Sequence, residues 1–250
     1  MGNNKRFGVL LAAADRDYVK KMYGGYFSLF VNMLGEEGER WDMFRAFDRQ
    51  LPKMEDLDKY DGFVVTGSKS DAHGNALWIL ELCQLLRCLY QMRIKVLGIC
   101  FGHQILCRAL GGKVSRSSAG WDVGTTKIHF NSSIRTKEYL SGMKIPTTLY
   151  LNEFHQDKVT EIPCGADIIA FSNKTEIEMF SMDDHIFGIQ GHPEYSGDIL
   201  FNLMDNLCNE GILTEEIVKK AKYSVEQYST VSEKEIWQQI CKRFLKYKVT

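Results

Sequence analysis

The chain has 250 residues, of which 44% are hydrophobic and four are proline, and its formal net charge is −1. This length and composition can bury a sizeable core and fit one large α/β domain better than two small ones. The near-neutral charge, without long blocks of one sign, favours neither a nucleic-acid nor an anionic-membrane partner. The apolar run 7–14, which stops at Asp15, is too short for a membrane span and lacks a signal-peptide cleavage pattern. We therefore expect a soluble enzyme or binding protein.

Cysteine usage indicates a reducing compartment. The seven cysteines are an odd number without the spacing of a disulfide framework, which favours the cytosol. Cys83 and Cys88 lie on a leucine-rich helical pattern without a second pair that would complete a zinc site, so we expect packing thiols. We predict no metal and no cofactor.

Strand and helix patterns alternate along the first part of the chain. Predicted strands occupy residues 7–12, 41–47, 60–65 and 94–97. After the first of them, apolar side chains recur at helical spacing from Val19 to Leu34, with Asp15 as the expected N-cap and a break at Gly24-Gly25. A second helical pattern covers 76–92. This alternation predicts an α/β fold with a doubly wound, mostly parallel sheet, helices on both faces, and sites at the carboxyl ends of the strands.

The pattern changes after Gly111-Gly112, which should end the helix that begins near residue 101. Shorter alternating strands, interpreted as an antiparallel extension of the sheet, are expected within 113–130, 147–151 and 167–182. A last strand at 187–190 and helices at about 197–208, 214–227 and 233–247 follow. No linker separates a second domain. We therefore expect a single domain over 1–250, with a core at about 7–208 and a C-terminal helical extension at about 209–250.

The segment Gly98-Ile99-Cys100-Phe101-Gly102, directly after a predicted strand, has the pattern of a nucleophile elbow built around cysteine. A nucleophile on a tight strand-to-helix turn has strained backbone geometry, and small residues two before and two after it relieve the crowding. The same turn points the first amides of the helix at the nucleophile, where they can stabilise a thiolate or an oxyanion. Cys100 is therefore a candidate catalytic nucleophile.

His192 and Glu194 are the candidate partners of Cys100. A cysteine nucleophile needs a base, and that base needs a third group to fix its tautomer. In an extended segment residues two apart project to the same side, which predicts contact between the two side chains. Taken alone, such a cysteine is usually a buried thiol and such a His-Pro-Glu sequence a surface turn, but both follow strands that end at one rim of the sheet. His103 is a rival base, for which we expect a packing or hydrogen-bonding role instead.

Acyl transfer through a thiolate also needs two donors for the developing oxyanion. The amide of Phe101, next to the nucleophile, is the natural first donor. The second candidate is Gly67, in a small polar loop after the strand at 60–65, because glycine permits close backbone approach. The plain alternative for this Thr-Gly-Ser sequence is an ordinary turn.

The segment from Gly98 to Gln104, together with 191–194, resembles the class I glutamine amidotransferases with a Cys-His-Glu triad, over about residues 7–208. The resemblance implies their flavodoxin-like fold, an oxyanion hole completed at Gly67, and a substrate contact at Gln104. It also implies that the backbone of His155-Gln156-Asp157 holds the α-amino and α-carboxylate groups of a glutamyl substrate. A metal pair is the alternative for His155 and Asp157, but neither has a third partner at ligand spacing.

Over nearly the whole chain the sequence is similar to the plant γ-glutamyl peptidases. The segments that carry this similarity are 23–27, 35–38, 58–63, 100–105, 190–195 and 236–246. It implies cytosolic hydrolysis of the γ-glutamyl bond of glutathione, its S-conjugates or related peptides, through a γ-glutamyl thioester on Cys100. The expected partner is a small molecule, without an obligate synthetase. A glutaminase subunit that feeds a separate synthetase, and a non-catalytic glutamyl-binding protein, are the alternatives.

Overall fold

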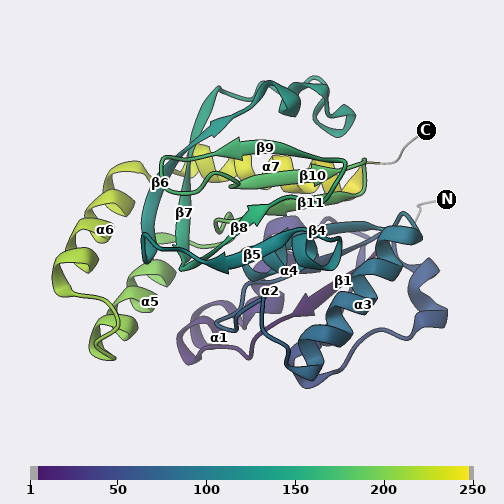
Figure 1. Cartoon of the computed structure of the whole chain (residues 1–250), viewed down its shortest axis with the longest axis horizontal. Coiled ribbons are helices and arrows are strands. Elements are labelled where there is room, and N and C mark those ends of the chain that lie inside the picture. Colours follow the sequence, from purple (N-terminus) through teal and green to yellow (C-terminus); the bar gives the residue numbers. More distant parts are fainter. Residues whose placement is uncertain (1–4, 248–250) are drawn as a thin grey trace.

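The computed structural model describes residues 5–247, which form a nine-stranded sheet with helices on both faces (Figure 1). The strand order is β2-β1-β3-β4-β11-β10-β9-β6-β7. Pairings from β2 to β11 are parallel and the remaining ones antiparallel, so the predicted doubly wound sheet with an antiparallel extension is confirmed. The strands are β1 Arg6–Leu11, β2 Arg40–Arg45, β3 Gly62–Val65, β4 Lys95–Ile99, β6 Asp122–Phe130, β7 Thr148–His155, β9 Ala166–Phe171, β10 Met179–Met182 and β11 Ile186–Ile189.

A second, two-stranded sheet of β5 (Lys113–Arg116) and β8 (Asp157–Glu161) packs beside α4. The helices are α1 Asp17–Tyr23, α2 Tyr26–Leu34, α3 Leu77–Gln91, α4 Phe101–Ala109, α5 Gly197–Asn209, α6 Glu215–Tyr228 and α7 Val231–Lys246. Short 3-10 helices lie at Ala46–Asp48, Met54–Lys59, Ser132–Thr136 and Glu138–Leu140.

Side-chain alternation along the central strands builds two cores. On β1, Phe7 and Val9 face the core shared with α2 and α7, while Leu10 faces the core shared with α3 and α4. Both sides are fully buried, which explains why the central strands are continuous apolar runs rather than alternating ones. The helices packed on the two faces of the sheet thus hold the central strands, and with them their carboxyl ends, in place.

The first helical region differs from the prediction at its cap. The break at Gly24-Gly25 is confirmed, and both glycines have positive φ angles of 75° and 98°. Asp15, however, does not cap α1, whose N-cap is Arg16. Its carboxylate instead accepts a hydrogen bond of 2.7 Å from the amide of Tyr26, at the start of α2. The glycine turn folds the chain back, so the first residue of α2 reaches Asp15.

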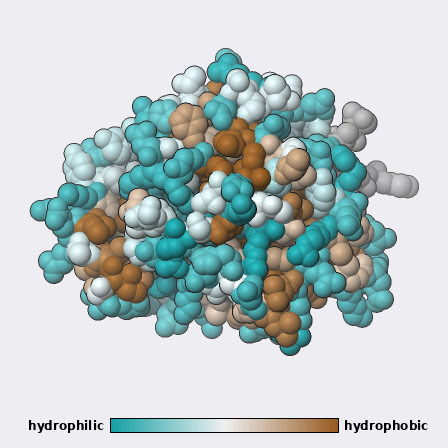
Figure 2. Space-filling view, in the orientation of Figure 1, coloured by the Kyte–Doolittle hydropathy of each residue, from teal (hydrophilic) through white to brown (hydrophobic). Residues whose placement is uncertain are grey.

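The C-terminal helix α7 packs against the face of the sheet, where it contacts β3, β4 and β7. Its Trp237 and Phe244 are buried, and the indole Nε1 of Trp237 donates to the Tyr150 carbonyl at 2.8 Å. In residues 5–247 no helix has both the length and the apolar character needed to cross a membrane. On the face shown in Figure 2, hydrophobic side chains form several patches separated by hydrophilic ones.

Candidate active site

Cys100 is the strained residue of the strand-to-helix turn between β4 and α4. Its φ of 52° and ψ of −106° lie outside the conformations that side-chain-bearing residues ordinarily adopt. A Cβ on Gly98 would lie 2.4 Å from the carbonyl oxygen of Gly102, and a Cβ on Gly102 would lie 2.2 Å from that of Val65. Both contacts are with backbone and cannot be relieved by a rotamer change. The two glycines therefore allow α4 to start directly above the strand ends.

His192 and Glu194 are in direct contact, although the backbone between them is not extended as predicted. The amide of Tyr195 donates to the His192 carbonyl at 3.3 Å, which closes a turn around Pro193. Within this turn His192 Nδ1 lies 2.7 Å from Glu194 Oε1, and both side chains are buried. The Tyr195 ring stacks on the imidazole, with centroids 4.0 Å apart and planes 3° apart. Carboxylate and ring together fix the orientation of the imidazole.

The imidazole of His192 lies at the same strand ends as Cys100 and Gly67. A Cβ on Gly67 would be 3.0 Å from His192 Cε1 and 3.7 Å from the Cβ of Cys100, so a side chain at this position would crowd the imidazole. Burial opposes the charged form of His192, but Glu194 and Cys100 together raise its pKa well above the usual value of 6.5. The geometry therefore favours an imidazolium beside the thiol, with the Gly67 backbone adjacent.

The amide of Phe101 occupies the first position of α4. The helical hydrogen bonds begin with the one from the amide of Gln104 to the Cys100 carbonyl, at 3.0 Å. The first amides of a helix have no partner within it, so that of Phe101 is available to an oxyanion. Its ring stacks on Trp78 at 5.5 Å, which holds the start of α4 against α3.

The sequence-predicted substrate residues Gln104, His155, Gln156 and Asp157 all line one cavity with Cys100. The side-chain nitrogen Nε2 of Gln104 donates to the Asp157 carbonyl at 2.8 Å and to Gln190 Oε1 at 3.1 Å, so both of its hydrogens are used within the protein. The result is a direct link between the elbow helix and the segment 155–157.

Arg116 on β5 fixes the same segment from outside. Its guanidinium donates to the Asp157 carboxylate and, at 3.0 Å, to Gln156 Oε1. Sequence reasoning missed Arg116, because nothing near it in the chain marks its pairing with β8. It also missed Tyr195, which the adjoining His-Pro-Glu sequence could have indicated.

His103 does not face the thiol. It is fully buried beside Phe180, with ring centroids 5.1 Å apart, and burial lowers its pKa to about 3. His103 therefore stays neutral at physiological pH and packs in the core. This fits the expected packing role and not that of a catalytic base.

The cavity at the triad has a volume of about 900 Å³. Its wall near Cys100 contains Gly67 and His192, and it extends to residues that the sequence did not single out. The additional apolar lining comes from Trp121, Phe154, Leu203, Leu207 and Ile212, and the additional cationic lining from Arg16 and Lys69.

Comparison with known proteins agrees with this geometry. The family model for the class-I glutamine amidotransferases matches residues 18–200. The chain is 46% identical over 243 residues to Gamma-glutamyl peptidase 3 of Arabidopsis thaliana, and the alignment covers 97% of each chain. It is also 46% identical over 247 residues to Gamma-glutamyl peptidase 5 of the same organism, and that alignment covers 98% of this chain and 97% of the relative. The fold matches a glutamine amidotransferase crystal structure from Thermotoga maritima with a TM-score of 0.75 at 18% identity, over 98% and 100% of the two chains. The chain therefore belongs to the class-I glutamine amidotransferase family.

Proposed function

We propose that this protein is a γ-glutamyl peptidase that hydrolyses the γ-glutamyl bond of glutathione, glutathione S-conjugates or related peptides and releases glutamate. Relatives named Gamma-glutamyl peptidase, 42% to 46% identical over nearly the full chain, support this activity. The observation that carries the proposal is the cavity, which continues well past the Cys100 thiol. Release of ammonia from glutamine needs little room on the leaving side, whereas release of a peptide needs a continuous cavity there.

In the proposed reaction the Cys100 thiolate attacks the γ-carbonyl carbon of the substrate. The amides of Phe101 and Gly67 hold the oxyanion, and His192, oriented by Glu194, protonates the departing amine. The carbon–nitrogen bond breaks and a γ-glutamyl thioester remains on Cys100. Water, deprotonated by His192, then attacks the thioester and regenerates the thiol.

We assign the apolar wall of the cavity to the departing part of the substrate. Trp121 and Phe154 form a ring pair with centroids 5.6 Å apart, and the leucines at 203 and 207 continue this apolar surface. Such a surface suits an apolar substituent on the cysteinyl sulfur. Arg16 and Lys69 make no ion pair within residues 5–247, so their charges are available to the carboxylate of the departing peptide.

Glutamate release from glutathione, S-benzylglutathione and glutamine tests the activity, with Cys100→Ala as the control. We expect both peptides to be cleaved faster than glutamine, and mass spectrometry to find a glutamyl adduct on Cys100 in quenched reactions. Faster turnover of glutamine would support a glutaminase subunit instead. Absence of both release and adduct with all three compounds would support a non-catalytic binding protein.

A variant of Ile212 tests the proposed conjugate preference. Ile212 lines the cavity and is exposed, so Ile212→Trp narrows its apolar end without overpacking the core, and we expect it to lower kcat/KM for S-benzylglutathione at least about tenfold more than for glutathione. Leu80→Trp, at an exposed position of α3 outside the cavity, is the matched control. An equal loss for both substrates would contradict a conjugate site at this end.

We further propose that the chain acts as one amidotransferase-like unit in the cytosol, without a synthetase partner. All seven cysteines lie in the described range and are free thiols, in keeping with a reducing compartment. Gel filtration of cell extract followed by activity assay tests the absence of a partner. Elution of the activity with a synthetase would contradict it.

A further inference from the structure

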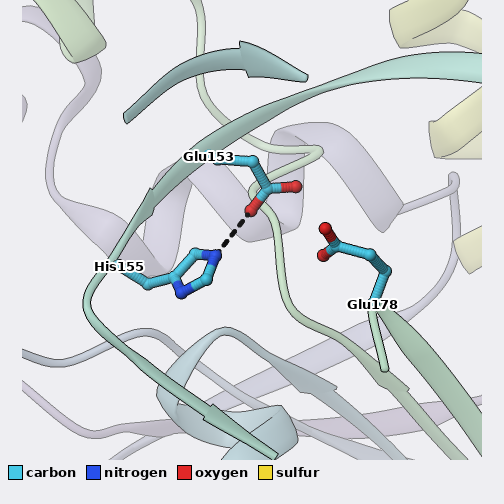
Figure 3. A group of neighbouring side chains, drawn as sticks. All are labelled: Glu153, His155 and Glu178. Atoms are coloured by element: carbon cyan, nitrogen blue, oxygen red, sulfur yellow. Dashed lines mark ion pairs between the residues drawn. The ribbon is translucent and has the colours of Figure 1, made fainter. Parts of the chain in front are cut away.

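A second group of titratable side chains, Glu153, His155 and Glu178, lies buried in the interior (Figure 3). Glu153 and His155 are two residues apart on β7 and point to the same side, and Glu178 directly precedes β10. The candidate ligand atoms of the three residues all lie within 4.8 Å of one another. The third partner that the sequence did not provide for His155 is therefore present in the fold.

The two carboxyl groups are buried in the interior. Glu153 and Glu178 have no exposed surface, and within the described chain none of their four oxygens has a hydrogen-bond partner. The Ser172 hydroxyl is near Glu178 but does not reach hydrogen-bonding geometry. Ionised carboxyls here require a compensating cation.

The orientation of His155 leaves one ring nitrogen free for such a cation. Its Nδ1 lies 2.9 Å from the Asp157 carbonyl oxygen, which can only accept, so the hydrogen is on Nδ1. Nε2 lies 3.3 Å from Glu153 Oε2 and makes no hydrogen bond within the described chain. Metal-bound histidines almost always donate their other ring N–H in this way. Two ligands about 2.1 Å from a tetrahedral ion are about 3.4 Å apart, which matches this spacing.

We propose that Glu153, His155 and Glu178 bind one divalent transition-metal ion, for which zinc is the best match to an imidazole and two carboxylates. With the ion bound, the two carboxylates would balance its two positive charges, and Nε2 of His155 would contribute a lone pair. The site joins β7 to β10, which are not neighbours in the sheet. A Cβ on Gly191 would lie 2.4 Å from Glu153 Oε1, so the site also supports the turn that carries His192.

Metal analysis of protein purified without a metal-binding tag tests the proposal. We expect about one equivalent of zinc per chain after refolding with zinc and removal of free ion. Glu178→Gln should lose this equivalent and unfold at least about 5 °C lower. Glu176→Gln, two residues away at an exposed glutamate paired with Lys158, should retain it. Wild-type protein without a bound equivalent, or equal zinc in both variants, would refute the site.

Cobalt substitution of the wild-type chain gives a readout that does not depend on a variant folding. We expect the visible spectrum of tetrahedral Co²⁺ with nitrogen and oxygen ligands, unchanged in Cys100→Ala. A thiolate charge-transfer band that disappears in Cys100→Ala would place the ion at the active-site cysteine and overturn the proposal.

Discussion

Replacing Gly102 by alanine should displace the start of α4 and misplace the Cys100 thiol. The new Cβ would lie 2.2 Å from the Val65 carbonyl oxygen and 2.8 Å from its carbon, whereas ordinary contact begins at 3.4 Å. Because both atoms belong to the backbone of β3, relief requires α4 to move by about 1 Å relative to Gly67. A displacement of this size costs about 100-fold in rate. Overpacking of this kind also destabilises by about 1–3 kcal/mol.

The assay measures kcat/KM for glutathione together with the thermal midpoint and the alkylation rate of Cys100. We expect a loss of kcat/KM larger than the loss of folded protein accounts for, because the displaced amide of Phe101 is the proposed oxyanion donor. Gly197→Ala is the matched control: it is also at the first turn of a helix, and its Cβ would meet only the end of Val225, at 3.1 Å. Unchanged kcat/KM in Gly102→Ala, with a folded protein, would refute the steric reasoning for the elbow.

Three further predictions concern groups around the triad. The pKa of His192 is raised, so its imidazolium persists above the usual pH range, and activity should fall as the pH rises through that pKa. Glu194→Gln should lower kcat by more than about 100-fold. Because it removes a carboxylate that raises the His192 pKa, it should also shift the alkaline limb of the pH–rate profile to lower pH. An unmoved alkaline limb would exclude this coupling. Tyr195→Leu removes the ring stacked on His192 and should lower kcat about tenfold, while Tyr195→Phe, which keeps the ring, should retain it in the same kinetic assay. Arg116→Met releases the Asp157 carboxylate and should raise KM for glutathione at least about threefold with kcat less affected; an unchanged KM would contradict its role.

The order of elements and the elbow could be predicted because both depend on local signals. The buried strands β1, β3 and β4 are short apolar runs, and helical spacing identifies α3. The elbow needs a nucleophile and two glycines within five residues, and the steric reason operates over that same distance. The predicted extended backbone from His192 to Glu194 is wrong, but the predicted contact between the two side chains is confirmed, because the turn also brings them together.

Asp15 was wrongly predicted to cap α1, because local spacing alone does not decide between two nearby helix starts. Asp15 precedes the helix at a suitable distance in the sequence, but the two positive-φ glycines reverse the chain within a few residues. A second helix start then competes for the carboxylate, and the Tyr26 amide forms the hydrogen bond. Local spacing identifies a capping residue without identifying which of two nearby helix starts it will reach.

The extent of the cavity and the buried group on β7 could not be predicted, because they depend on strands that pair across long stretches of chain. Glu153 meets Glu178 only because β7 and β10 lie in one curved sheet, and Arg116 reaches Asp157 only through the β5–β8 pairing. Through Asp157 that pairing also orients the backbone next to Gln104, on the elbow helix. The position of the candidate nucleophile thus depends on local sterics, whereas the positions of the proposed substrate contacts depend on strand pairing. Substitutions in β5 or β8 should therefore alter substrate choice while leaving the elbow intact.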